Sequence, residues 1–340
     1  MRQRAHVAFA FIAVGTALYF STSSDDGTMS SSIAKARAAN AQLNLSGKQA
    51  IVVGGTSGIG HGIAVRLAQA RASVTIVGRS ATRGAAIVAE MESAAAAAAA
   101  ASGPAGASTA PAYDFVACDC FSLSDTAKIG SDLAARPQGV DILVMSQGMA
   151  TTQGFTPTAE GLDQKLTLHV WSRAVLAAAV LPALRRSDDG RMLSVLSGGI
   201  HGSGPAWRND PELKSHYGIK AAADTAGFYN DIMLDSLARS APEVTFAHAA
   251  PGFVNTNWGT EMPTLIRWAV RAMQPLGRSK ADCGEYMVRG IMGSCSKGGF
   301  HLLNQYGLTG PSVTSEHEEA RESVWTHIEK VVKAKGSVQA

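Results

Sequence analysis

The residues most suited to chemistry form a glycine-rich turn within residues 50–60, Ala-Ile-Val-Val-Gly-Gly-Thr-Ser-Gly-Ile-Gly. A short β-branched run ends in spaced glycines, and a helix-like segment follows. This order lets bare backbone approach a pyrophosphate, whose charge the unpaired N–H groups at the helix N-terminus can bind. We therefore expect a dinucleotide cofactor at this turn. The residues expected to contact it are Gly54, Thr56, Ser57, Gly58, Ile59 and Gly60.

The end of the second predicted strand indicates which dinucleotide is preferred. Folds that select NAD usually place an acid there, hydrogen-bonded to the ribose 2′-hydroxyl. Here the sequence is Val77-Gly78-Arg79-Ser80, and no acid appears before Glu90. A guanidinium can bind a 2′-phosphate with two hydrogen bonds, whereas a carboxylate would repel it. Arg79 therefore predicts NADP, and a solvated surface arginine is the alternative interpretation.

These residues are positioned by a regular alternation of strands and helices. Apolar runs such as residues 142–145, Ile-Leu-Val-Met, are typical of parallel strands buried on both faces. Right-handed crossovers then predict an α/β fold, a doubly wound parallel sheet with helices on both faces (a Rossmann-type three-layer sandwich), with the site at the carboxyl ends of the strands. Strands are predicted at 51–53, 74–77, 114–117, 142–145, 192–196 and 244–248, and helices at 59–70, 80–91, 124–135, 162–184, 212–237 and 315–335.

The glycine spacing, Gly-x-x-x-Gly-x-Gly, resembles that of the short-chain dehydrogenase/reductase family. The resemblance runs from about residue 48 to near residue 300, although Val53 stands where members usually carry Thr. Residues 251–256, Pro-Gly-Phe-Val-Asn-Thr, match the family motif Pro-Gly-x-Val-x-Thr. The resemblance implies cofactor contacts at Pro251, Gly252, Val254 and Thr256, the last two at the nicotinamide carboxamide.

Two further cofactor contacts follow from the resemblance. Asp119 ends the third strand, where members commonly place an acid against the adenine; its alternative role is to cap the helix that follows. After the fourth strand members usually show Asn-Asn-Ala-Gly, whereas this chain has Met145-Ser146-Gln147-Gly148. Gly148 keeps the close backbone approach, but the asparagines are absent.

The resemblance also implies a reaction centre of Ser, Tyr and Lys, with an Asn supporting a water relay. Hydride transfer to a carbonyl needs a proton donor and a group that orients the oxygen. Ser197, near the end of the fifth predicted strand, falls where the orienting serine sits. His169 falls where the asparagine sits, and it either holds a water or is a buried, satisfied core histidine.

The spacing of the remaining two residues departs from the family. Members place Tyr four residues before Lys, whereas Tyr217 stands three before Lys220, and His216 takes the tyrosine position. Residues three and four apart share one face of a helix, so Tyr217 and Lys220 are still expected to meet. We expect Lys220 to bind the ribose and to lower the pKa of the acid. Tyr217 is the first candidate acid/base and His216 the second, and the third interpretation is that there is none.

Together the motifs imply an NADP-dependent oxidoreductase that interconverts a primary or secondary alcohol and its carbonyl by hydride transfer. Trp and Met in the segments 202–214 and 258–268 predict an apolar small-molecule substrate, although loops packed over the sheet have the same composition. The alternative is a catalytically silent dinucleotide-binding scaffold or redox sensor with the same fold. The altered residues at 145–147, His169 and the Tyr217–Lys220 spacing favour that alternative.

Composition excludes other classes of protein. The 340 residues are 46% hydrophobic and 17% charged, which suits one large α/β domain with extensions. The formal net charge is +3 and the basic residues are spread along the chain, so no nucleic-acid partner is expected. The four cysteines have neither a zinc-like spacing nor a disulfide framework, so no metal site is predicted.

The ends of the chain differ in character from its middle. A basic start and an apolar run over residues 7–20 predict a secretory signal or a short membrane anchor, with a transit peptide to an organelle as the alternative. We therefore expect membrane association or the secretory pathway (endoplasmic reticulum), and residues 1–45 outside the fold. The catalytic domain is predicted over 46–312, with a low-complexity insertion at 93–112 and a helical extension at 313–340. The family resemblance implies a homo-oligomer, and a membrane-anchored monomer is the alternative.

Overall fold

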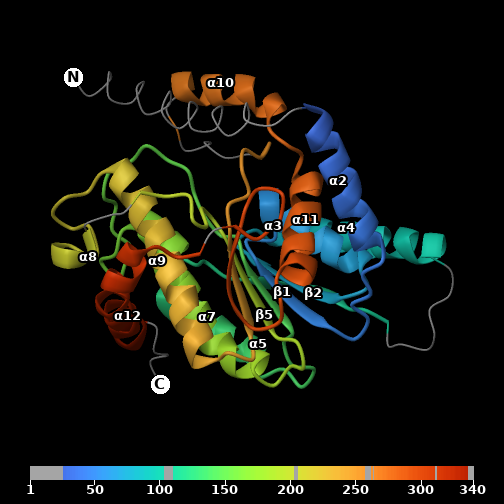
Figure 1. Cartoon of the computed structure of the whole chain (residues 1–340), viewed down its shortest axis with the longest axis horizontal. Coiled ribbons are helices and arrows are strands. Elements are labelled where there is room, and N and C mark those ends of the chain that lie inside the picture. Colours follow the sequence, from blue (N-terminus) through green and yellow to red (C-terminus); the bar gives the residue numbers. More distant parts are fainter. Residues whose placement is uncertain are drawn as a thin grey trace.

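A seven-stranded parallel sheet forms the centre of the computed structural model, which describes residues 26–102, 110–202, 206–256, 262, 264–310 and 312–335. Its strand order is β3-β2-β1-β4-β5-β6-β7, and every neighbouring pair is parallel. The predicted doubly wound sheet is confirmed (Figure 1). The strands are β1 (Gln49–Val53), β2 (Ser73–Gly78), β3 (Tyr113–Ala117), β4 (Ile142–Met145), β5 (Arg191–Val195), β6 (Thr245–Ala249) and β7 (Gly299–Leu303).

The sheet reverses its direction of growth between β1 and β4. β1 pairs with β2 on one side and with β4 on the other, where Ala50 lies opposite Ile142. The whole of β4 is buried, as is β1 except for Gln49, because helices cover a parallel strand on both faces. In such sheets the ligand site lies at this switch point, outside the carboxyl ends of the strands.

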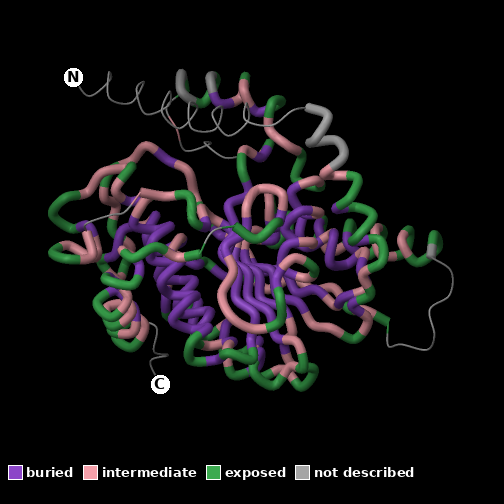
Figure 2. Tube along the Cα trace, in the orientation of Figure 1, coloured by how far each residue is buried: buried purple, intermediate pink, exposed green. Residues whose placement is uncertain are grey.

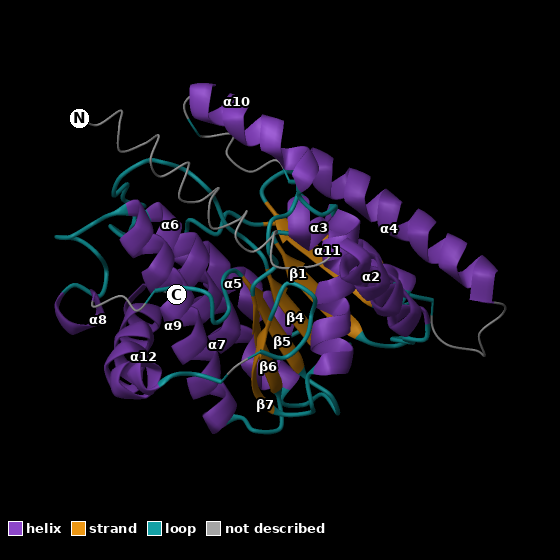
Figure 3. Cartoon of the chain, turned by 45° about the horizontal axis from the view of Figure 1, so that its top comes forward, coloured by secondary structure: helices purple, strands orange, loops and turns teal. Residues whose placement is uncertain are grey.

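Helices form a layer on each face of the sheet (Figures 1 and 3). One layer contains α3 (Gly58–Gln69), α4 (Ala81–Ser102) and α11 (Lys280–Arg289), with α2 (Asp26–Ala41) packed on α11. The other contains α5 (Leu123–Ala134), α7 (Ser172–Leu184) and α9 (Ile219–Ser240), with α12 (Ser315–Lys335) packed on α9. The shorter elements are α6 (Gln164–Leu166), the π-helix η1 (Thr167–Trp171), α8 (Ala206–Asn209), α10 (Thr264–Met273), the 3-10 helix η2 (Gln274–Leu276) and the π-helix η3 (Gly290–Ser294).

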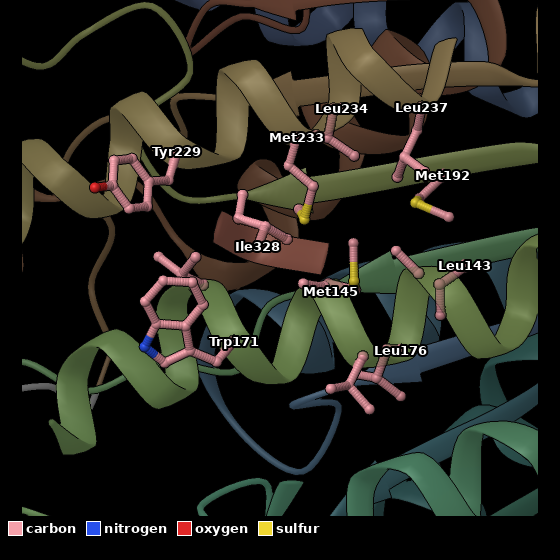
Figure 4. Packing of buried hydrophobic residues seen from close by; sticks show 14 of the residues in the cluster. Leu143, Met145, Trp171, Leu176, Met192, Tyr229, Met233, Leu234, Leu237 and Ile328 are labelled. Atoms are coloured by element: carbon pink, nitrogen blue, oxygen red, sulfur yellow. The ribbon is translucent and has the colours of Figure 1, made fainter. Parts of the chain in front are cut away.

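Two apolar cores fill the space between the sheet and these layers (Figure 2). In the core under α7, α9 and α12, Met145 of β4 lies near Met233 and Ile328, and Met192 of the neighbouring strand lies near Leu237 (Figure 4). Ile328 belongs to α12, so the predicted C-terminal helix forms as expected and also contributes to the main core. Buried apolar surface of this kind is the main favourable term in folding.

Part of the segment expected outside the fold belongs to it. On α2, Ala36 is fully buried, and the side-chain amide of Asn40 donates a hydrogen bond to Glu285 Oε2 at 2.6 Å. Beyond the helix, the N–H of Leu45 donates to the carbonyl of Ala70 at 2.7 Å. The folded domain therefore begins before residue 46, the boundary predicted for it. The apolar run at residues 7–20 lies outside the described residues.

Most predicted elements lie within two residues of the observed ones. Helix α4 continues through the alanine run to Ser102, because alanine is the strongest helix former, and residues 103–109 of the insertion are not described. β7 and α11 were not predicted, because β7 begins with glycine and the charged residues of α11 are spread among its apolar residues along the whole helix. The start predicted for α9 is wrong by seven residues. The residues responsible lie in the candidate active site, described below.

Two helical stretches in the described chain, Ala81–Ala101 and Gln164–Leu184, are long and apolar enough to span a membrane. Most of the second is buried inside the protein, as a core helix would be. The first is the mostly exposed alanine-rich helix α4, and two such stretches are weak evidence for a membrane span.

The contact between α3 and α11 depends on two glycines. A Cβ on Gly62 would overlap the carbonyl of Lys280, and a Cβ on Gly284 would overlap the carbonyl of Gly62. We expect Gly62→Ala to lower the free energy of unfolding by about 1–3 kcal/mol, as overpacking does. Chemical denaturation measures the change. Gly154→Ala is the control, since no atom lies within 4 Å of a Cβ at that position, and equal losses in both variants would contradict the packing argument.

Candidate active site

The glycine turn after β1 lies directly against the loop after β4. Gly54, with φ of +81°, and Gly58, with φ of +57°, adopt the left-handed conformation that favours glycine. A Cβ on Gly54 would lie 2.7 Å from the backbone nitrogen of Gln147. A Cβ on Gly60 would overlap the hydroxyl of Ser146. Only bare backbone therefore fits between the two loops.

Other predicted cofactor residues lie at the same edge of the sheet. A Cβ on Gly58 would be 3.3 Å from the methyl group of Thr256, and one on Gly78, at the end of β2, would be 2.7 Å from the hydroxyl of Thr56. Ser57 is the N-cap residue of α3 but makes no side-chain capping hydrogen bond. Its helix therefore leaves N–H groups of the first turn available to an anion.

The loop after β6 is fixed by pairing with the segment that follows η2. Gly252 has φ of +70°, and Val254 is buried. The N–H of Asn255 donates to the carbonyl of Arg278 at 2.8 Å, and the N–H of Arg278 donates to the carbonyl of Phe253 at 3.1 Å. This pairing holds the motif of residues 251–256 beside the glycine turn.

Arg79 and Asp119 lie at the ends of β2 and β3. The guanidinium of the exposed Arg79 lies over the ring of Phe121, 5.4 Å from its centroid. Asp119 Oδ1 accepts the N–H of Phe121 at 3.1 Å, so this carboxylate also stabilises the turn before α5. Within the described chain Arg79 forms no ion pair with a carboxylate, so its charge is available at the position where a dinucleotide fold places the adenosine ribose.

Ser197 follows β5, and a buried histidine–aspartate pair supports its backbone. Its N–H donates to His248 Nε2 at 3.2 Å, and His248 Nδ1 lies 2.5 Å from Asp231 Oδ1. Since Nε2 accepts, Nδ1 carries the hydrogen and donates to the carboxylate. Burial opposes ionisation of Asp231, but His248 and the hydrogen bonds from the surrounding histidines hold the pKa of this carboxyl well below its usual range. The Ser197 hydroxyl has no partner among the described residues and faces Gly227 of α9.

Helix α9 begins after Tyr217, at Ile219, and this corrects the prediction that Tyr217 and Lys220 share a helix face. Gly218 is extended, with φ of −148° and ψ of 150°. The carboxylate of Asp210 accepts the backbone N–H groups of residues 214, 215 and 216 at 2.8–2.9 Å, so the preceding segment wraps around Asp210 and cannot form helical hydrogen bonds.

The lysine that contacts Tyr217 is Lys165. Its ammonium donates to the Tyr217 hydroxyl at 2.9 Å, and that hydroxyl donates to Asp163 Oδ1 at 3.1 Å. Burial, with the nearby Asp163 charge, raises the pKa of Tyr217 well above its usual range. Lys220 instead pairs with Asp224, so the expected lowering of the Tyr217 pKa by Lys220 is not found.

His216 and His169 occupy opposite environments. The His216 side chain is 84% exposed and lies 3.5 Å from Asp210. His169 sits in η1, where its Nε2 accepts the N–H of Met149 at 3.1 Å and its carbonyl accepts the side-chain amide of Asn230 at 2.6 Å. A Cβ on Gly148 would lie 2.8 Å from the same Nε2. His169 therefore holds the loop after β4 from within the protein.

Sequence reasoning missed Asp163, Lys165, Asp231 and His248. His248 had a visible signal, because it is an ionisable residue within a predicted parallel strand, whereas Asp163, Lys165 and Asp231 lie in predicted helices and had none. Buried polar groups are nearly always hydrogen-bonded, so such residues predict an internal partner. The identity of that partner depends on the tertiary fold.

His169 is expected to make stability depend on pH. Burial, with Arg173 and Lys165 nearby, lowers the pKa of His169 to about 3. Because an unfolded histidine titrates near 6.5, this contribution to stability is complete above about pH 6.5 and is lost as the pH falls toward 3. His169→Gln keeps an acceptor for the Met149 N–H but does not titrate, so its free energy of unfolding should fall less steeply with decreasing pH. Urea denaturation of both proteins across this range tests this, and parallel curves would refute it.

The sequence matches the short chain dehydrogenase family model over residues 48–264. An oxidoreductase of Emericella nidulans is 26% identical over 340 positions, covering 88% of this chain and 98% of that protein. A short chain dehydrogenase of Pseudocercospora fijiensis is 33% identical over 159 residues, 46% of this chain and 47% of that one.

Solved structures share the fold. A 3-oxoacyl (acyl-carrier-protein) reductase of Agrobacterium tumefaciens C58, with NADP bound, has a TM-score of 0.54 and 21% identity, covering 78% of this chain and 96% of its own. A short chain dehydrogenase of Escherichia coli CFT073, complexed with NADPH, has a TM-score of 0.55 and 17% identity over 78% and 98% of the two chains. This chain belongs to the short-chain dehydrogenase/reductase family and is an NAD(P)-dependent oxidoreductase.

Proposed function

We propose that this enzyme uses NADP to interconvert an apolar primary or secondary alcohol and its carbonyl compound. The observation that carries the cofactor choice is Arg79, exposed at the end of β2 with no carboxylate partner in the described chain. The glycine turn fits a dinucleotide because Gly54 and Gly58 adopt the left-handed conformation of such a turn and Ser57 leaves the first turn of α3 without a side-chain cap. When bound, NADPH supplies the hydride for carbonyl reduction.

Named residues would hold this cofactor. The N–H groups at the start of α3 would bind the pyrophosphate, and Arg79 the 2′-phosphate, with two charge-assisted hydrogen bonds. Asp119 would lie against the adenine, and Val254 and Thr256 against the carboxamide. Gly148 precedes Met149, whose N–H is held by His169, and would lie near the nicotinamide end.

Tyr217 is the proposed proton donor. Its raised pKa keeps the phenol protonated at neutral pH, and the Lys165 ammonium at 2.9 Å would stabilise the phenolate left after proton transfer. Lys165 thus replaces Lys220 in stabilising that charge. Ser197, whose hydroxyl makes no hydrogen bond to the described residues, would orient the carbonyl oxygen. His216 is the second candidate donor.

The proposal extends to substrate polarity, targeting and assembly. Trp268 is the last residue of the segment 258–268 expected to border the substrate, and its 71% exposure on α10 favours an apolar substrate. The basic start and apolar run at residues 7–20 support a secretory-pathway or membrane location. The family resemblance supports a homo-oligomer.

The cofactor proposal predicts that Arg79 makes the enzyme prefer NADPH to NADH. We expect NADPH to bind about 10- to 100-fold more tightly than NADH, the range for hydrogen bonds to a charged group. Arg79→Ala should remove most of that preference while leaving NADH affinity unchanged, so NADH is the internal control. Fluorescence titration of the wild-type and variant proteins with both nucleotides measures this. A preference for NADPH that survives the substitution would rule out Arg79 as its source.

The acid/base proposal predicts unequal effects of two substitutions. Tyr217→Phe should lower kcat for carbonyl reduction by roughly 100-fold or more, the usual contribution of a general acid. His216→Ala should change kcat little, because the His216 imidazole is exposed and the lysine that would stabilise the proton donor, Lys165, contacts Tyr217 instead. NADPH consumption with a panel of apolar ketones and aldehydes measures both. If His216→Ala shows the larger loss, the roles are reversed; if neither variant changes turnover, the proton comes from elsewhere.

A further inference from the structure

The loop that follows β5 and carries Ser197 is held by two carboxylates of α9. Asp231, in the middle of that helix, is fully buried, and its Oδ2 accepts the N–H of Gly199 at 3.2 Å. Asp224 lies two turns earlier on the same helix and accepts the N–H of Gly202 at 3.0 Å. Residues seven apart lie on one face of a helix, so one face of α9 holds the loop at two points.

His201 lies in the same loop, and both of its ring nitrogens face acceptors. Its Nδ1 lies 3.2 Å from the carbonyl of Gly202, and its Nε2 lies 2.8 Å from Asp231 Oδ2. A carbonyl and a carboxylate can only accept hydrogen bonds, and a neutral imidazole carries a single N–H. Both contacts are therefore hydrogen bonds only when His201 carries two hydrogens and a positive charge. Its side chain is 4% exposed, so this charge is buried beside the carboxylate.

The other two histidines that face Asp231 are neutral. His248 of β6 accepts the Ser197 N–H at Nε2 and so carries its hydrogen on Nδ1, which faces Asp231 Oδ1. His317 of α12 accepts the N–H of Thr314 at Nδ1, at 3.2 Å, and so carries its hydrogen on Nε2, 3.4 Å from Asp231 Oδ2. Neither ring balances the negative charge of the carboxylate, so the loop histidine supplies the positive charge.

The imidazole of His201 also lies beside the Ser197 hydroxyl. A Cβ on Gly227 of α9 would lie 2.5 Å from Ser197 Oγ and 2.7 Å from His201 Cδ2, so both side chains pack on the same bare backbone. The ring centroids of Phe228 and His317 lie 5.8 and 5.5 Å from that of His201. A shift of the His201 ring would therefore change the surroundings of the Ser197 hydroxyl.

We propose that protonated His201 is a positioning residue, which pairs with Asp231 and thereby fixes the loop that carries Ser197. The inference rests on the proposed function, in which Ser197 orients the carbonyl oxygen. Loss of the proton removes one of the two hydrogen bonds of His201 and leaves Asp231 buried without a positive partner, which is costly. The loop is then held less firmly on α9, and the Ser197 hydroxyl no longer holds the carbonyl oxygen in the geometry that reduction needs.

The charges around His201 determine the pH range over which it acts. Burial alone would lower the pKa of His201, but the hydrogen bond and charge of Asp231, with the Gly202 carbonyl and the Asp224 charge, raise it above its ordinary value of 6.5. Lys220 pairs with Asp224 and partly offsets that charge, and the other two histidines are neutral. Because the pKa in the folded protein is raised, the positioning contribution is complete below about pH 6.5 and is lost as the pH rises through the raised pKa.

The pH dependence of carbonyl reduction tests this role. With saturating NADPH, kcat of the full-length enzyme should fall by about 10- to 100-fold as the pH rises above the pKa of His201. Tyr217 does not account for such a fall, because burial and the Asp163 charge raise its pKa well above its usual range. His201→Gln keeps a hydrogen-bond donor but does not titrate, so its kcat should already be low at about pH 7 and change little at higher pH. Its affinity for NADPH should equal that of the wild-type enzyme.

A second titrating group and a matched control variant separate the outcomes. Burial lowers the pKa of Lys165, so a decline of the same shape in the wild-type enzyme and in His201→Gln would assign the decline to Lys165 and overturn the proposal. His301→Gln, on β7 and hydrogen-bonded to the Gly298 carbonyl, should keep the wild-type profile. Circular dichroism checks the fold of both variants.

Nitrogen NMR of the histidine side chains reads the charge of His201 without any turnover. In the ¹⁵N-labelled wild-type protein, assigned through its backbone, no variant has to fold. We expect the signals of an imidazolium at about pH 7, where an unperturbed histidine is mostly neutral. A neutral His201 at that pH would overturn the proposal. A protein with a charged His201 that binds NADPH but reduces no carbonyl compound would contradict the proposed function, and with it the role of Ser197, so the two failures are distinguishable.

Discussion

The close contact of two glycines with the loop after β4 constrains the edge of the sheet where we propose that the cofactor binds. Gly54 and Gly60 bring the turn after β1 against Ser146 and Gln147 of the loop after β4. The Ser146 hydroxyl then donates to the carbonyl of Val53 at 2.8 Å and extends the pairing of the two strands beyond their ends. Any side chain added here would separate the two halves of the sheet at the proposed cofactor site.

A buried polar network fixes the position of the loop after β4 relative to the proposed reaction centre. Arg173 is almost fully buried and donates to the carbonyl of Gln147 at 2.7 Å and to the hydroxyl of Ser194 at 2.6 Å. Ser194 donates in turn to Asn230, whose amide holds the carbonyl of His169. Buried polar groups cost free energy when a partner is lost, so the network stays intact only in one arrangement of β5, α7 and α9. The network therefore holds the backbone near Ser197 and Gly148 in one fixed arrangement.

The sequence predicted the features that depend on local interactions, and it did not predict those that depend on residues distant in the chain. Strands such as β4 are apolar throughout because both faces are covered, and the glycine turn combines a strand end, a turn and a helix start within eleven residues. Both were therefore predictable. The start of α9 was not, because Asp210 draws the N–H groups of residues 214–216 out of a helix that their composition allows. The partner of Tyr217 was not either: Lys165 reaches it across 52 positions, while Lys220, three residues away, turns to Asp224.

The order of strands in the sheet also determines when the site can be built. β1 is made early, but its partner β4 follows only after β2 and β3 with their helices, and β5 to β7 then add outward from β4. During synthesis one edge of β1 therefore waits unpaired until residue 145 has left the ribosome. Of the described elements α12 comes last in the chain, and its contact with α9 places His317 beside Asp231. A nascent chain can thus pair its first three strands well before α12 is available to pack on α9.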